Sequence, residues 1–247
     1  MAVRTTVLVL HGYTQSATTF SKRLGALRRE CGKDVEFVFV DGPIILQPAD
    51  LPMPLNALDA ADTAETNEAR AWWNWDSSKT EARGLPETLQ VMRDILKSRH
   101  FDGVLGFSQG ATFAAILAAL LERPEVYPPF LVDGQAPHPP FKFAVVVSGF
   151  KLADPIADTI YGTSFSTPTL HVIGRNDVVV SEERSRLLAS ISTNARIEEH
   201  DGGHFVPSKG NWRKFLAAYL KNPTGNVASP SNTSGTATPV DTQTMKL

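Results

Sequence analysis

The sequence predicts a single α/β domain in which about six mainly parallel strands are flanked by helices. Its 247 residues are 42% hydrophobic and 20% charged, which suits one domain with a large core. Short β-rich runs alternate with helical patterns, the order typical of a parallel sheet covered on both faces. A Gly-x-Ser-x-Gly sequence also falls between a strand-like run and an alanine-rich helical run. We therefore expect one domain over residues 1–222, with ligands bound at the carboxyl edge of its sheet.

Six segments are strand candidates, most of them short runs rich in apolar and β-branched residues. They are Thr5–Leu10, Val35–Val40, Gly103–Phe107, Phe143–Ser148, Thr169–Ile173 and Arg196–His200. Helical patterns separate most of them, so these strands should run parallel and end at the same edge of the sheet.

The helices are predicted from apolar residues that recur at intervals of three and four. Between the first two strands, Phe20, Leu24, Leu27 and Cys31 predict one amphipathic helix over 16–31. Further helices are expected over 85–96, 111–121, 182–191 and 211–220. Because Cys31 is the single cysteine, we expect it to pack in the core of a protein from a reducing compartment.

Three stretches interrupt the alternation of strands and helices. Residues 42–78, 123–140 and 150–167 are rich in proline or aromatic side chains, and we expect each at the carboxyl edge of the sheet. Residues 223–247 are mostly Ser, Thr, Pro, Gly and Asn, so we expect a disordered tail there.

The sequence Gly106-Phe107-Ser108-Gln109-Gly110 predicts a nucleophile elbow, a sharp turn between a strand and a helix. The turn brings backbone segments so close that a Cβ at either flanking glycine would clash. Ser108 would then stand on a strained corner, with its hydroxyl pointing out at the carboxyl edge of the sheet as a nucleophile. The alternative is a serine that only N-caps the following helix.

A serine nucleophile needs a base that accepts its proton and a carboxylate that orients the base. Both types follow later predicted strands: Asp177 lies in the loop after 169–173, and His204 lies in a glycine-rich loop after 196–200. Ser108, His204 and Asp177 are therefore the predicted nucleophile, base and acid.

Two alternatives concern the same loops. Asp201 could replace the acid, but its carboxylate would have to fold back onto a histidine three residues away. His200 and His204 have the spacing of zinc ligands on a helix, yet Gly202 and Gly203 between them disfavour a helix. We therefore expect no metal and no cofactor.

An acyl-transfer site also needs two backbone N–H groups for the oxyanion. The amide of Gln109 directly follows the nucleophile, and the amide of Tyr13 lies in the turn after the first strand. These two amides are the predicted oxyanion hole. His11 is expected to support that turn by bonding its backbone, without taking part in proton transfer.

Charge and hydropathy exclude several classes of partner. The formal net charge of −2 gives no basic surface for a nucleic acid or an anionic membrane. The apolar stretch Val7–Leu10 is too short for a signal peptide, and nothing else suggests a membrane span. We therefore expect a cytoplasmic protein.

Six motifs taken together resemble one known family. They are VLVLHGYTQSA at the start, DGP at 41–43, RAWWNWD at 70–76, GFSQGA at 106–111, HVIGRND at 171–177 and HDGGHFVP at 200–207. In this order they resemble the FSH-type family of serine hydrolases over about residues 3–220, a family that includes a human ovarian-cancer-associated hydrolase. The resemblance implies an α/β-hydrolase fold, the triad of Ser108, Asp177 and His204, and hydrolysis of an ester or thioester.

The resemblance extends to fungal stand-alone thioesterases that release a polyketide from its synthase, a branch with similar Trp-rich and Pro-rich stretches. It implies a hydrophobic acyl substrate and, as a partner, the acyl carrier domain of a polyketide synthase. A short-chain carboxylesterase, an acyltransferase and a non-catalytic binding protein of the same fold are the alternatives.

An apolar acyl chain needs a desolvated wall, which aromatic side chains in the interrupting stretches can supply. The candidates are Trp72, Trp73, Phe150, Tyr161 and Phe165. The alternative for each of them is ordinary packing of a loop onto the domain.

Overall fold

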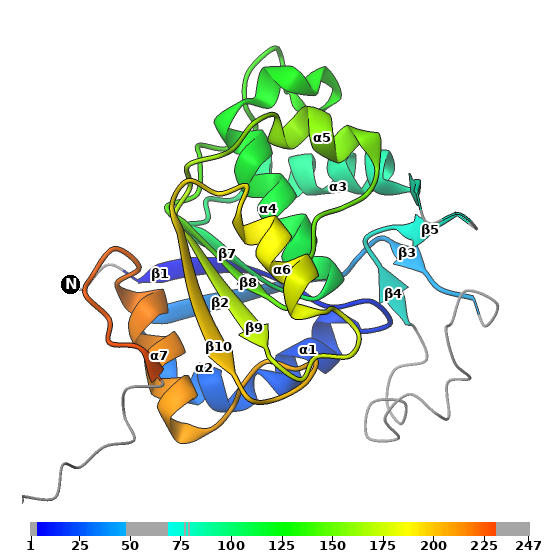
Figure 1. The fold of residues 1–247 in the computed structure, drawn as a ribbon. Coiled ribbons are helices and arrows are strands. Elements are labelled where there is room, and N and C mark those ends of the chain that lie inside the picture. The colour runs from blue at the N-terminus through cyan, green and yellow to red at the C-terminus, as the bar shows by residue number, and fades with distance from the viewer. Residues whose placement is uncertain (1–3, 48–68, 77, 79, 231–247) are drawn as a thin grey trace, which may run out of the picture.

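The computed structural model describes residues 4–47, 69–76, 78 and 80–230, and its centre is a six-stranded sheet (Figure 1). The strand order is β10-β9-β8-β7-β1-β2, and every neighbouring pair is parallel. The strands are β1 (Thr5–Leu10), β2 (Val35–Val40), β7 (Gly103–Phe107), β8 (Phe143–Val147), β9 (Thr169–Gly174) and β10 (Ala195–His200). The predicted fold class is confirmed, and each predicted strand forms with at most one end shifted by a residue.

Helices cover both faces of the sheet (Figure 1). They are α1 (Ala17–Arg23), α2 (Gly25–Cys31), α3 (Leu85–Ser98), α4 (Gln109–Glu122), α5 (Pro155–Tyr161), α6 (Glu182–Ala189) and α7 (Gly210–Lys221). α1, α2 and α7 bury Phe20, Leu27 and Trp212 in one core, and the other four helices contribute to a second core on the opposite face. Cys31 is buried in the first core, where burial raises the pKa of its thiol to about 11.

Helix α4 is buried on every side from Gln109 to Leu121. It packs against β7 and β8 on the sheet and against α5 on its outer side. A helix that is apolar all round is stable only in such a position. The start of α4, which directly follows Ser108, is therefore held firmly at the carboxyl edge of the sheet.

The prediction of one helix over 16–31 is wrong, because two helices form with a break at Leu24. The ψ angle of Leu24 is 6°, away from helical values, and Gly25 begins the second helix. Leu24 nevertheless stays buried with Phe20 and Leu27. The apolar residues that predicted the helix therefore face the same core on both sides of the break.

The stretch 123–140 does not lie at the carboxyl edge of the sheet, and that prediction is wrong. Since α4 runs back from the carboxyl edge, its end at Glu122 leads to the amino edge. There the backbone N–H of Phe101, just before β7, donates to Nε2 of His138 at 2.9 Å. The stretch forms two short 3₁₀ helices, Pro124–Val126 and Pro128–Phe130, and cannot cover a site at the opposite edge.

The stretch 42–78 follows β2, and its described strands take part in two small antiparallel pairs, one of them with a strand just beyond the stretch. β3 (Ile44–Ile45) pairs with β4 (Arg70–Ala71), and β5 (Asn74–Trp75) pairs with β6 (Ala82–Arg83). Figure 1 shows these pairs together at one side of the domain. Residues 48–68, 77 and 79 lie outside the described residues.

The predicted tail begins with residues 223–230, which are described, whereas 231–247 are not. Val227 packs against the core beside α7, and the side-chain amide of Asn211 donates to the carbonyl of Pro230 at 3.0 Å. Ser229 donates a hydrogen bond of 2.6 Å to Glu198. Within the described part of the chain, no helix has the length and apolar character needed to cross a bilayer.

Candidate active site

Ser108 occupies the sharp turn between β7 and α4 with φ at 54° and ψ at −119°. Its backbone N–H donates to the carbonyl of Val147 on the neighbouring strand at 2.8 Å, which fixes the turn to the sheet. Ser108 stands at the N-cap position of α4, but its side chain caps no backbone N–H. The strained conformation therefore serves to present the hydroxyl, a pattern common at functional sites.

The two flanking glycines are required by close backbone contacts. A Cβ at Gly106 would lie 2.2 Å from the carbonyl oxygen of Gly110, and one at Gly110 would lie 2.4 Å from the carbonyl oxygens of Leu10 and His11. These are backbone atoms of the elbow, of the last residue of β1 and of the residue that follows it, so moving them would distort the sheet or the turn.

Gly110→Ala should therefore destabilise the fold by about 1–3 kcal/mol, the usual cost of overpacking a core. Chemical denaturation followed by circular dichroism measures this change. Gly210→Ala is the matched control, because Gly210 also begins a helix but has nothing within 4 Å of its Cβ position. Equal stabilities for the two variants would contradict the close-contact argument.

The side chains of Ser108, His204 and Asp177 form one hydrogen-bonded line across three strand ends. Nε2 of His204 lies 2.9 Å from Oγ of Ser108, and its Nδ1 lies 2.7 Å from Oδ2 of Asp177. Ser108 is 8% exposed, and the side chains of His204 and Asp177 are 18% and 1% exposed, so the line is largely shielded from solvent. The structure thus brings together all three predicted residues.

Asp177 is held as an ionised acceptor. Burial favours its neutral form, but hydrogen bonds from the Val180 amide, from His204 and from the Val179 amide outweigh burial and lower the pKa of the carboxyl below its ordinary value. An ionised carboxylate can only accept, so Nδ1 of His204 carries the proton. Nε2 is then free to accept from the hydroxyl of Ser108, the tautomer that a general base needs.

Asp201, the alternative acid, points away from His204. Its carboxylate pairs with Arg175 at 3.0 Å, and its side chain is 88% exposed. The loop that carries His204 is instead held by His200 at the end of β10. The backbone N–H of Gly202 donates to Nδ1 of this buried histidine at 3.1 Å. This supporting role of His200 was not apparent from the sequence, because nothing in the spacing distinguishes it from a packing histidine.

The predicted oxyanion donors lie at the start of α4 and in the turn after β1, two segments that come close together where the Cβ position of Gly110 is 2.4 Å from the His11 carbonyl oxygen. Gln109 begins α4, and Tyr13 lies in a turn closed by a 3.2 Å hydrogen bond from the Gln15 amide to the Gly12 carbonyl. The side chain of Gln15 also accepts from the Gly12 amide at 3.0 Å, which tightens the same turn.

His11 is fully buried below this turn. Its Nε2 accepts from the Gly42 amide at 2.8 Å, so its Nδ1 donates to the Gly12 carbonyl, also at 2.8 Å. Burial lowers the pKa of His11 to about 4, so the ring stays neutral near pH 7. Its position matches the expected supporting role.

Stability should depend on pH through His11 and through His171, whose pKa burial also lowers to about 4. At a pH between 6.5, the ordinary pKa of histidine, and about 4, these two rings are protonated in the unfolded chain but not in the folded protein. The free energy of unfolding should therefore fall with decreasing pH, by up to about 1.4 kcal/mol per pH unit for each ring. Urea denaturation at pH 7, 6 and 5 measures the slope, which His171→Gln should reduce. An unchanged slope in that variant would exclude the contribution of His171.

The five aromatic residues expected to line an acyl pocket are buried in the core. They are Trp72, Trp73, Phe150, Tyr161 and Phe165. Tyr161 stacks on Phe165, and the ring of Phe150 lies under the Arg184 guanidinium at 4.6 Å. Burial of all five favours the packing alternative, and the sequence could not decide this because aromatic composition is the same in a core and in a pocket wall.

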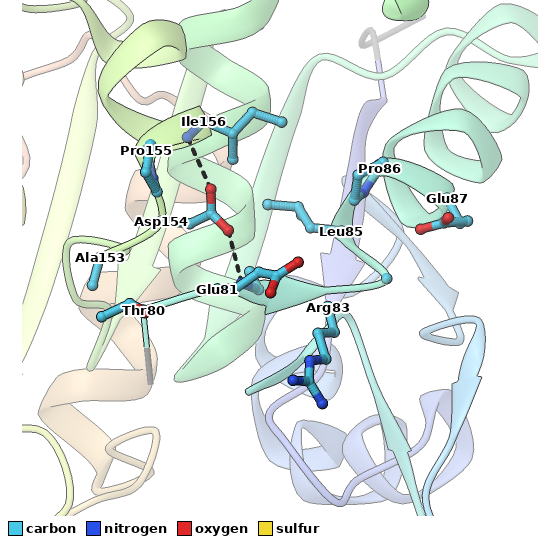
Figure 2. Close-up of a pocket in the computed structure, with 12 residues that line it drawn as sticks. Thr80, Glu81, Arg83, Leu85, Pro86, Glu87, Ala153, Asp154, Pro155 and Ile156 are labelled. Carbon is cyan, nitrogen blue, oxygen red and sulfur yellow. Dashed lines mark hydrogen bonds between the residues drawn. The ribbon is translucent and has the colours of Figure 1, made fainter. Parts of the chain in front are cut away.

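A cavity of about 890 Å³ lies between β6, the start of α3 and the start of α5 (Figure 2). Asp154 at its centre accepts from the Ile156 amide at 2.9 Å and from the Ala82 amide at 2.7 Å, which ties α5 to β6. The carboxylate is occupied by these bonds, and no triad residue lines the cavity. The cavity is therefore separate from the reacting groups.

The model of a family described as "Serine hydrolase (FSH1)" matches residues 1–216 of this chain. Esterase OVCA2 of Danio rerio is 34% identical over 233 residues, which cover 89% of this chain and 98% of that protein. A protein named dihydrofolate reductase from Schizosaccharomyces pombe is 32% identical over 218 residues, but this chain spans only 46% of its length.

Solved structures share the fold at lower sequence identity. Zea mays acyl-protein thioesterase 2 superposes with a TM-score of 0.57 and 19% identity, covering 89% of this chain and 95% of that one. Esterase PE8 gives a TM-score of 0.56 with 19% identity, covering 89% and 93% of the two chains. At this identity the likeness is one of fold alone.

Proposed function

Because the chain belongs to the FSH1 family of serine hydrolases, we propose that Ser108, His204 and Asp177 are its catalytic triad and that it hydrolyses hydrophobic acyl thioesters or esters. The observation that carries the proposal is the unbroken hydrogen-bonded line from Asp177 through His204 to Ser108. The strained turn under the serine is a second support.

In the first half of the reaction, Oγ of Ser108 attacks the acyl carbon while Nε2 of His204 accepts the hydroxyl proton. The carbonyl oxygen becomes an oxyanion and accepts hydrogen bonds from the amides of Gln109 and Tyr13. When the tetrahedral intermediate collapses, the bond to the leaving group breaks and His204 gives its proton to the departing thiolate or alkoxide. The acyl group remains as an ester on Ser108.

In the second half, His204 takes a proton from water, and the resulting hydroxide attacks the acyl ester. Collapse of this second intermediate returns the proton to Ser108 and frees the carboxylic acid. Asp177 stays ionised throughout and stabilises the imidazolium that forms twice in each cycle.

Exposed apolar side chains beside the triad support a hydrophobic substrate. Val178 and Val179, directly after Asp177, are 95% and 60% exposed, and Phe205, directly after His204, is 45% exposed. The Val179 amide donates to Oδ1 of Asp177 at 2.9 Å, so these exposed valines directly adjoin the acid of the triad. Apolar surface at the mouth of a site suits an acyl chain better than a polar substrate.

The finer proposal is a thioesterase that releases a polyketide or a similar acyl chain from an acyl carrier domain. Its support is the resemblance of the Trp-rich and Pro-rich stretches to fungal enzymes of that kind. The esterase names of relatives such as the Danio rerio protein, and the burial of the five aromatic residues, favour a short-chain carboxylesterase as the second candidate.

A substrate series separates these two candidates. For acyl-pantetheine thioesters, the proposed thioesterase should show kcat/KM rising by about 10²- to 10³-fold from acetyl to octanoyl, because each buried methylene contributes up to about 0.8 kcal/mol. Steady-state assays with p-nitrophenyl butyrate on the same enzyme serve as the reference. A preference for butyrate, with no gain from longer chains, would favour the carboxylesterase.

A further inference from the structure

The segment from Arg70 to Trp73 lies between the two loops that would supply the oxyanion donors. On one side it pairs with the turn after β1, where the Thr14 amide donates to the Arg70 carbonyl at 3.0 Å and the Arg70 amide donates to the Gln15 carbonyl at 3.2 Å. Tyr13 directly precedes Thr14. The position of its backbone N–H is therefore coupled to the position of this segment.

On its other side the same segment is bound to the nucleophile elbow through the side chain of Gln109. The Gln109 carbonyl oxygen Oε1 accepts from the Trp72 amide at 2.9 Å, and its Nε2 donates to the Trp73 carbonyl at 2.8 Å. This side chain acts as a strand partner would, satisfying one donor and one acceptor of a buried backbone. Nothing in the GFSQG motif alone predicts which backbone it reaches.

The indole of Trp72 forms a further link between this segment and the residues after β1. Its Nε1 donates to the carbonyl of His11 at 2.8 Å, at the point where β1 passes into the oxyanion turn. The indole ring lies 5.1 Å from the rings of both His11 and Phe113, and the Trp72 carbonyl accepts from Thr88 at 2.7 Å. Trp72 thus contacts β1, α3 and α4 while exposing almost nothing to solvent.

Oxyanion stabilisation depends on donors held within about 0.5 Å of their productive positions. The two donors here come from loops separated by nearly a hundred residues, so their spacing must be set by whatever bridges them. We propose that Trp72 is a positioning residue of the oxyanion hole, which joins the Tyr13 turn to the Gln109 elbow through its indole N–H and its backbone amide. This inference rests on the proposed function and gives Trp72 a role other than the substrate wall expected from the sequence.

Trp72→Phe tests the proposal, because phenylalanine keeps an aromatic ring between His11 and Phe113 but removes the hydrogen bond to the His11 carbonyl. For p-nitrophenyl butyrate, kcat should fall about 10- to 100-fold while KM changes less than about twofold, since the oxyanion forms only after binding. Binding of a trifluoromethyl ketone of the same acyl group, which forms the oxyanion on Ser108, should weaken by the same factor as kcat/KM. Trp75→Phe is the matched control, since Trp75 lies two residues beyond the segment, in β5, and makes no described hydrogen bond to the Tyr13 turn. It should leave kcat within about twofold.

Gln109→Met is the second variant if Trp72→Phe does not fold, because it keeps the Gln109 backbone amide and removes only the side-chain bridge. It should show the same loss in kcat with KM retained. Unchanged kcat in a folded Trp72→Phe enzyme, or a loss of ketone binding that does not follow kcat/KM, would overturn the positioning role. Ser108→Ala run in parallel separates the two questions: activity that survives this variant refutes the proposed function itself.

Discussion

Ser108→Ala is expected to lower kcat/KM for p-nitrophenyl butyrate by about 10⁴- to 10⁶-fold, because the proposed reaction depends on this nucleophile. Alanine removes the only hydroxyl placed 2.9 Å from Nε2 of His204 among the described residues. The remaining donors could still bind an oxyanion, so activity should drop to a residual level above that of water. The variant should also fail to react with a fluorophosphonate probe, which intact-mass spectrometry detects directly.

Ser148→Ala provides the matched control for this experiment. Ser148 is also buried, follows the adjacent strand β8 and has a positive φ of 52°, yet its hydroxyl has no hydrogen-bond partner within the described residues. Its loss should leave kcat/KM and probe labelling close to those of the unchanged protein. Hydrolysis by Ser108→Ala at the rate of the Ser148→Ala control would show that another group carries the reaction.

Asp177→Asn should lower kcat by about 10³- to 10⁴-fold with little change in fold. The amide can donate to Nδ1 of His204, which stabilises the tautomer whose proton lies on Nε2 and cannot accept from Ser108. Asparagine also removes the negative charge that stabilises the imidazolium. Stopped-flow labelling with a fluorophosphonate should slow in proportion to kcat, because both reactions need the activated serine.

Asp201→Asn is the corresponding control on the alternative acid. Because the Asp201 carboxylate faces solvent and Arg175, the variant should retain kcat within about twofold. If Asp201→Asn lost more activity than Asp177→Asn, the orienting acid would have been assigned to the wrong loop.

Local sequence patterns predicted the sheet because most of its strands are short, β-rich runs such as Val7–Leu10 and Phe143–Val147, separated by helical patterns. They also predicted which three side chains meet, since Gly106 and Gly110 allow only a sharp turn around Ser108, and the two later loops each offer one suitable group. These inferences needed only short-range information. The parallel fold then brought the loop ends to one edge.

What the sequence could not predict depends on contacts between distant segments. The break at Leu24 leaves the apolar stripe unchanged, so periodicity could not detect it. The location of 123–140 at the amino edge follows from the direction of α4, which composition does not encode. Trp72 looked like a pocket residue because its partners, His11 and Gln109, lie far away along the chain.

The loops that carry Asp177 and His204 are bound to each other along their whole course. The Asn176 amide donates to the Gly202 carbonyl at 3.1 Å, the Asn176 side chain donates to the Asp201 carbonyl at 2.7 Å, and the close approach of Gly174 to Gly203 leaves no room for a Cβ. By contrast, the imidazole reaches the elbow through one hydrogen bond and a contact with the Phe107 ring. Acid and base should consequently move as one rigid unit. Any displacement of these loops would therefore withdraw acid and base together from the serine, with the imidazole still oriented by Asp177.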